Sequence, residues 1–180
     1  SLSTCLELVT LLGEQACAGT LRQSLGPDLL RQMPEHANDL WLALAKSALL
    51  QQDAAAAAQA LAQVTGDIGI GRIAVFNALL SAELALVRGQ VDAALALLPA
   101  PQDEGMNDES RLRALALRVR ACSQTHAALD TPLMAECSAA LHTEPVHATA
   151  ALYLHAALAA AAAQGVAGVP ATAAADAAAH

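Results

Sequence analysis

Residues 41–61, WLALAKSALLQQDAAAAAQAL, hold the pattern that decides the fold of this chain. Leucine and alanine supply most of the first ten positions, and both are strong helix formers. The polar pair Gln51-Gln52 interrupts the run, and Asp53 then precedes five consecutive alanines. The pattern predicts two helices, residues 38–50 and 53–64, joined by a tight turn into an antiparallel hairpin.

The composition of the whole chain extends this helical character beyond the quoted stretch. Of the 180 residues, 47 are alanine and 31 are leucine, whereas aromatic residues make up only 2%. The β-branched and aromatic residues that strands prefer are therefore scarce. With 56% hydrophobic and 14% charged residues, the chain is also too apolar for the disordered class. An all-α fold is the class that the composition predicts.

Turn signals divide the chain into about eight helices. Beyond the first hairpin, helices are predicted at residues 73–87, 91–98, 108–126, 131–142 and 145–164. Asp108 is expected to cap the third of these. We expect residues 1–34 to form an N-terminal helical hairpin or cap, and residues 35–164 to form the main array. The alanine-rich residues 165–180 are predicted to form a final short helix or to fray.

The predicted helices alternate between long and short segments, and the pattern repeats along the chain. A shift of 37 residues places Ala45 over Ala82, and it places the turn Gln51-Gln52 over the turn Arg88-Gly89. Coinciding turns at a fixed period are typical of stacked helical hairpins.

This pattern resembles the tetratricopeptide repeat, in which small residues and large apolar anchors follow one another at fixed offsets. The matching residues of three successive units are Trp41, Leu44, Ala45, Ala48, Ala57 and Leu61, then Ala78, Ala82, Ala85, Ala94 and Leu98, then Leu117, Ala121, Leu133, Cys137, Ala140 and Pro145. Ser81 and Arg120 replace expected leucines, and aromatic residues are scarcer than in the family. The resemblance implies stacked antiparallel hairpins wound into a right-handed superhelix. An alanine-rich bundle without a superhelix is the alternative.

The resemblance also implies where a partner binds, because in this family the first helix of each hairpin lines a concave groove. Carried over by motif offset, the groove residues are Asp39, Leu42, Lys46, Leu49, Phe76, Leu79, Glu83, Leu86, Arg118 and Thr125, with Leu115 and Cys122 beside them. Such a groove is apolar with isolated charges, which suits an amphipathic helix or an extended peptide. A second interpretation is that several of these leucines pack against neighbouring helices.

Charge argues against a nucleic-acid partner for this segment. Nine basic residues stand against 17 acidic ones, so the net charge is −8. The densest basic stretch, residues 111–120, follows acidic residues in the order that suits the dipole of a helix. The longest apolar run, residues 148–163, is mostly alanine and too short for membrane insertion. Four scattered cysteines indicate buried thiols in a reducing compartment, so we expect a cytoplasmic protein, or a periplasmic one if a signal has been removed.

The sequence offers no support for catalysis, a cofactor or a bound metal. His142, His147 and His155 form the one histidine cluster, but no cysteine has ligand spacing to them. The glycines at positions 66, 69 and 71 have neither a preceding strand nor a following Lys-Ser or Lys-Thr. They therefore predict a turn and not a phosphate loop.

These observations predict a protein–protein interaction module that binds a peptide or helix of a partner protein. The alanine excess and the single lysine are typical of a GC-rich bacterial genome, so the parent is expected to be a larger bacterial regulator or a secretion or export protein. A small-molecule-binding helical effector domain of a transcription regulator is the alternative, and an enzyme accessory domain is a third. An effector domain differs from an open array in having an enclosed cavity.

Overall fold

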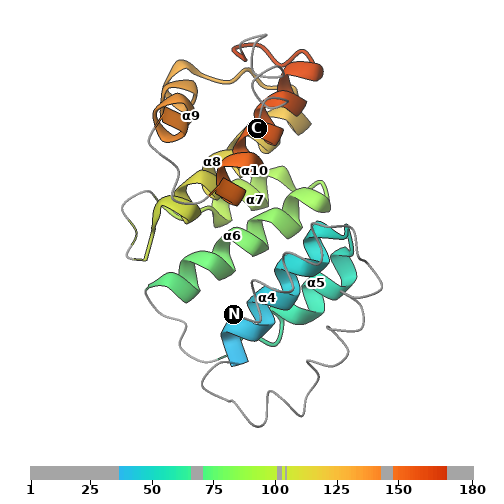
Figure 1. Ribbon diagram of the computed structural model, residues 1–180. Helices are drawn as coiled ribbons and strands as arrows, with labels where there is room; N and C mark the ends of the chain where they lie inside the picture. The colour runs from blue at the N-terminus through green and yellow to red at the C-terminus, as the bar shows by residue number, and fades with distance from the viewer. Residues whose placement is uncertain (1–36, 66–70, 101–102, 104, 143–147, 170–180) are drawn as a thin grey trace.

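The computed structural model describes residues 37–65, 71–100, 103, 105–142 and 148–169. These residues form helices and turns and contain no strand, which confirms the all-α prediction. The helices are α4 (Ala37–Leu50), α5 (Ala54–Leu61), α6 (Arg72–Val87), α7 (Val91–Leu97), α8 (Asp108–Thr125), α9 (Thr131–His142) and α10 (Ala148–Ala163) (Figure 1). The predicted N-terminal unit at residues 1–34 and most of the tail at residues 165–180 lie outside the described residues.

Side-chain caps set where individual helices begin. Asp53 accepts a hydrogen bond of 2.9 Å from the amide of Ala56 and caps α5. Asn107 accepts a hydrogen bond of 2.8 Å from the amide of Ser110 and caps α8. The prediction that Asp108 is this cap is therefore wrong by one residue. Asp108 instead lies in the first turn, where its negative charge suits the helix dipole.

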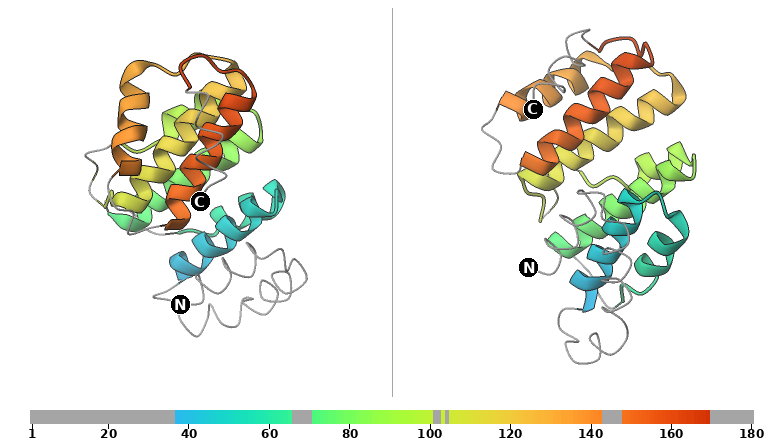
Figure 2. Two further views of the ribbon diagram at one scale, coloured as in Figure 1. Left: turned by 45° about the horizontal axis from the view of Figure 1, so that its top comes forward. Right: turned by 45° about the vertical axis from the view of Figure 1, so that its right-hand side comes forward.

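Successive helices pair into hairpins, and each hairpin packs against the next one along the chain. α4 packs against α5 and α6, α6 packs against α7 and α8, and α8 packs against α9 and α10. The second helices α5 and α7 also contact the first helix of the hairpin that follows. Figure 1 shows this succession from α4 to α10, and in Figure 2 α8 and α10 lie side by side. The main contacts thus join elements that are close in the order of the chain.

Among the described residues, the buried apolar side chains form three cores that follow the same succession. The first core lies between α4, α5 and α6, the second between α6, α7 and α8, and the third between α8, α9 and α10. Ala45, Ala82 and Ala121, which match small positions of the repeat pattern, are at most 2% exposed. Because an alanine side chain is a single methyl group, two backbones can approach each other closely at these positions.

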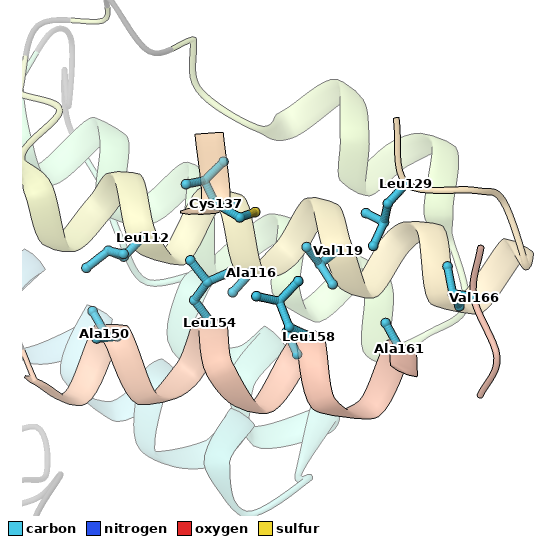
Figure 3. Packing of buried hydrophobic residues seen from close by; sticks show 13 residues of the cluster. Leu112, Ala116, Val119, Leu129, Cys137, Ala150, Leu154, Leu158, Ala161 and Val166 are labelled. Carbon is cyan, nitrogen blue, oxygen red and sulfur yellow. The ribbon is translucent and has the colours of Figure 1, made fainter. Parts of the chain in front are cut away.

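The third core is formed mainly by α8 and α10, which run in the same direction (Figure 3). Its central side chains are Leu112, Ala116 and Val119 of α8, Ala150, Leu154, Leu158 and Ala161 of α10, and Cys137 of α9. Burial raises the pKa of the Cys137 thiol to about 11, so this thiol is protonated at neutral pH. Cys137 therefore acts as a small apolar residue of the core, as the sequence predicts for the cysteines.

Candidate functional site

Polar and aromatic side chains from four helices meet at one place among these apolar helices. We call them the polar cluster, which consists of Lys46 of α4, Phe76 and Glu83 of α6, Glu109, Arg113 and Arg120 of α8, and Tyr153 of α10. The helices α4, α6 and α8 are the first helices of the three described hairpins. Each of these hairpins therefore contributes at least one charged side chain to the polar cluster.

Glu83 is the centre of the polar cluster and is only 3% exposed. Its Oε1 accepts hydrogen bonds from Arg120 Nη1 at 3.0 Å and from Tyr153 Oη at 2.8 Å. Its Oε2 lies 3.7 Å from Nη2 of Arg113. One carboxylate of α6 thus connects side chains of α8 and α10. Its burial depends on these partners, because an unpaired charge is strongly unfavourable in a protein interior.

Tyr153 is a neutral hydrogen-bond donor in this network. Desolvation by burial raises the pKa of its phenol, and the negative charge of Glu83 and the hydrogen bond to Glu83 raise that pKa further. At neutral pH the phenol therefore stays protonated, and its O–H donates a hydrogen bond to the carboxylate of Glu83. Because Tyr153 and Glu83 are 70 positions apart in the sequence, this hydrogen bond connects α10, the last described helix, to α6.

Arg113 is almost completely buried and lies against two aromatic rings. Its Cζ is 5.4 Å from the ring centroid of Phe76 and 5.3 Å from that of Tyr153. Lys46 Nζ is 5.8 Å from the same Phe76 centroid. A cation within about 6 Å of a ring centroid is attracted by the quadrupole of the ring. The one phenylalanine and the one tyrosine of the chain both serve to hold cations in the polar cluster.

A narrow cleft lies between α4, α8 and α10, beside these groups. Its lining residues are Lys46, Leu50, Glu109, Arg113, Thr149, Ala150 and Tyr153. The cleft has a volume of about 10 Å³, which is room for about one water molecule or one ligand oxygen. Lys46 Nζ and Glu109 Oε1 are 3.9 Å apart, and their side chains are 9% and 36% exposed. This cleft is the candidate functional site.

Several leucines predicted to line a groove are buried between helices. Four of them are only 1–3% exposed, namely Leu42 and Leu49 of α4 and Leu79 and Leu86 of α6. They present almost no surface to a partner, in agreement with the second interpretation of the sequence pattern. The physical reason is that α4 and α6 are apolar around most of their circumference and bury most of it.

Three other predicted groove residues meet in the polar cluster, namely Lys46, Phe76 and Glu83. Asp39 lies outside the polar cluster, where it is exposed and forms an ion pair of 3.3 Å with Arg72. Thr125 is exposed at the end of α8, and its hydroxyl donates to the carbonyl oxygen of Ala121 at 3.1 Å. The structure therefore brings only part of the predicted set together.

Arg118, which the resemblance places in the groove, is not part of the polar cluster. Its Nη1 lies 3.7 Å from Glu136 Oε2 of α9. Arg113 and Arg120 reach Glu83 instead, because seven residues make about two helical turns and leave both on one face of α8. Arg118 lies about 140° around the helix from Arg113. The sequence pattern did not predict Arg113, Arg120 or Tyr153, and the seven-residue spacing is the signal that could have found the two arginines.

A second and wider hollow lies on the hairpin of α4 and α5. It has a volume of about 370 Å³, and its lining residues are Trp41, Leu44, Ala48, Ala56, Gln59, Ala60 and Gln63. This lining carries no charge and contains the one tryptophan of the chain. The hollow therefore differs from the narrow cleft in both size and chemistry.

Metal ligands and membrane-spanning helices are not found in the described part of the chain. No group of three or more His, Cys, Asp or Glu side chains there is placed to hold a metal ion. His142 Nδ1 lies 2.7 Å from the carbonyl oxygen of Ser138, and His147 lies outside the described residues. None of the described helices is long and apolar enough to cross a bilayer.

Comparison with known proteins leaves the residues themselves as the basis for a function. No protein-family model, curated protein or solved structure matches the chain.

Proposed function

We propose that this chain is a protein–protein interaction module, built as a tetratricopeptide-like array, that binds a peptide or helix of a partner protein. The observation that carries the proposal is the cleft where Lys46 of α4, Arg113 of α8 and Thr149 of α10 meet. A single ligand group at this cleft contacts helices from three parts of the array at once. Such a shared contact is what an array needs in order to recognise one continuous ligand.

The packing of the helices supports an array. The main contacts follow the order of the chain, and the buried apolar side chains of the described helices form three consecutive cores. Repeat arrays have this property because each unit packs mainly against its neighbours. The right-handed superhelix and the array limits at residues 35–164 are parts of this proposal. So are the cytoplasmic location, the larger bacterial parent protein and the lack of a catalytic step.

Site-specific photocross-linking tests the proposal. A photoreactive amino acid at Thr149, which is exposed and lines the cleft, is expected to form adducts with a partner protein in lysate of the source organism. The same amino acid at Leu95, which is exposed on α7 and does not line the cleft, is the matched control. We expect Lys46→Gln to remove the adducts at position 149. No adduct at this position, or the same adducts at both positions, contradicts the proposal.

The wider hollow supports a second candidate function, the binding of a small molecule. Its volume of about 370 Å³ falls in the range of ligand pockets, and its lining is uncharged and mostly apolar. Because Trp41 lines the hollow and is the one tryptophan of the chain, its fluorescence reports directly on occupancy. A saturable change in Trp41 fluorescence on titration with an apolar probe dye supports this function. The double variant Trp41→Phe/Ala60→Trp fills the hollow with a larger side chain at position 60, and dye emission is expected to show that this variant no longer binds the dye. Unsaturable dye binding contradicts it.

A further inference from the structure

Helix α10 lies against residues that the sequence pattern predicts for a partner-binding groove. Its Tyr153 donates a hydrogen bond of 2.8 Å to Glu83, and its first turn lines the narrow cleft together with Lys46. Leu115 and Cys122, which are predicted beside the groove, belong to the third core together with apolar side chains of α10. Figure 3 shows α10 lying along α8 in this core. Predicted groove residues of α4, α6 and α8 therefore lie beside a helix of the chain itself.

The space left beside α10 is too small for a bound helix. An α-helix with its side chains is about 10 Å across, whereas the narrow cleft between α4, α8 and α10 has a volume of about 10 Å³. A helix-sized surface exists where α10 itself packs. We call it the α10-binding surface, which is formed on α6 and α8 by Glu83, Leu112, Leu115, Ala116 and Val119. A partner helix that reaches Glu83 must therefore take the place of α10.

The contacts of α10 allow it to leave while the other described helices stay packed. Its main packing partner is α8, whereas α4 packs on α5, α6 packs on α7, and α6 packs on α8 without its participation. Four alanines and two leucines of α10 are buried in the third core, namely Ala150, Ala151, Leu154, Ala157, Leu158 and Ala161. Because an alanine side chain buries a single methyl group, this face gains less free energy from burial than a leucine-rich face of equal length.

We infer that α10 is an autoinhibitory helix, which covers the α10-binding surface until a partner helix of similar chemistry replaces it. The replacing helix presents small and branched apolar side chains to α8 and one hydroxyl donor to Glu83, as α10 does. Thr149 lies in the first turn of α10 beside the cleft, so a photoreactive group there captures the partner as it enters. The release of α10 rests on the contacts above, and only the source of the replacing helix in another protein rests on the proposed function.

Binding of a separate α10 peptide to the full chain tests the inference. The probe is a fluorescent peptide with the sequence of residues 148–163, followed by two lysines for solubility, and the readout is fluorescence anisotropy. The peptide binds those molecules whose own α10 has left, so its apparent affinity is proportional to the released fraction. Tyr153→Phe in the full chain removes the hydrogen bond to Glu83 and is expected to tighten peptide binding about fivefold. Leu158→Ala, which leaves a cavity in the third core, is expected to tighten it about 30-fold.

Leu152→Ala is the matched control, because Leu152 is exposed on the same helix, and its peptide affinity is expected to equal that of the wild type. A peptide that carries Tyr153→Phe is expected to bind the Tyr153→Phe chain about fivefold more weakly than the unchanged peptide does, since it lacks the hydroxyl that donates to Glu83. Equal affinity of the two peptides overturns the inference. Unchanged binding in the Tyr153→Phe chain also overturns it, and this variant decides the result if Leu158→Ala does not fold.

The peptide titration and the cross-linking experiment separate the inference from the proposed function. Adducts at position 149 without peptide binding leave the interaction module standing and overturn the release of α10. Peptide binding without adducts supports α10 as a releasable helix and removes the partner protein. Adducts that the unlabelled α10 peptide displaces support both.

Discussion

Two neighbouring residues of α10 are held in different ways. Leu154 is fully buried in the third core among apolar side chains, whereas Tyr153 donates a hydrogen bond to Glu83 of α6. The apolar contact gains free energy from every buried methylene and tolerates small changes of geometry. The polar contact gains less net free energy and depends on defined distances and partners. The stability of the packed helices and the relative position of α6, α8 and α10 therefore have separate sources.

The largest loss of stability is expected from shortening Leu154, the buried apolar residue of this pair. Leu154→Ala removes a fully buried side chain from between α8 and α10 and leaves a cavity. We expect it to lower the free energy of unfolding by about 3–4 kcal/mol, measured by urea denaturation. The control is Leu152→Ala on the same helix, where the side chain is exposed and the expected change is within about 0.5 kcal/mol. Equal effects of the two substitutions would show that α10 does not pack on α8 through Leu154.

A smaller loss is expected from removing the charge at the centre of the polar cluster. Glu83→Gln leaves Arg113 and Arg120 without their counter-charge in a nearly closed interior. The expected loss is about 2–3 kcal/mol, below the full cost of breaking a buried pair because the Arg120 side chain is 27% exposed.

The matched control for this loss is an exposed pair of the same chemistry. Glu136→Gln removes the partner of Arg118, and both side chains of that pair are substantially exposed. We expect it to change the free energy of unfolding by less than about 0.5 kcal/mol. If Glu83→Gln costs no more than Glu136→Gln in the same urea titration, the polar cluster does not hold the helices together.

The hydrogen bond between α10 and α6 is expected to contribute less again. Tyr153→Phe removes the phenol hydroxyl and leaves Glu83 with its arginine partners, so we expect a loss of about 1 kcal/mol at neutral pH. Because folding raises the pKa of this phenol above its ordinary value of 10.0, the folded state keeps a proton that the unfolded state loses above that pH. This contribution to stability is complete below about pH 10 and is lost as the pH rises further.

Urea titrations of wild type and Tyr153→Phe from pH 7 to pH 11 measure both quantities. The difference between the two proteins is expected to be constant up to about pH 9 and to shrink at higher pH, because only the wild type has this phenol to titrate. A difference that grows with pH would contradict the hydrogen bond to Glu83. Tyr153 is the one tyrosine of the chain, so its ultraviolet absorbance also follows the titration directly.

The ends of the helices could be predicted from the sequence far better than the direction in which each helix points its polar side chains. The predicted helix at residues 73–87 differs by one residue from α6, because Gly71 and Arg88-Gly89 mark its ends locally. The face of α8 could not be predicted in the same way. Its buried residues lie all around the helix, so apolar periodicity does not distinguish the face of Arg113 from that of Arg118.

The polar cluster could be predicted only in part for a related reason. The motif offset predicted Lys46 and Glu83, which are 37 residues apart, and both side chains belong to the polar cluster. The hydrogen bond from Tyr153 to Glu83 spans 70 residues and depends on how α8 and α10 pack, which no local pattern encodes. Local signals therefore place the helices, and long-range packing decides which polar groups meet.

The smallest effect on stability is expected at the ion pair of Asp39 and Arg72. This pair joins α4 to α6 at the surface of the protein. The two side chains are 46% and 72% exposed at a distance of 3.3 Å, so solvent and salt screen their attraction. Asp39→Asn is expected to change the free energy of unfolding by less than about 0.5 kcal/mol in low salt, and by less still in 1 M NaCl. Urea denaturation at both salt concentrations measures this. Because Asp39 and Glu83 both pair with arginine across helices, a loss at Asp39 as large as that at Glu83 would mean that burial is not what gives the polar cluster its effect.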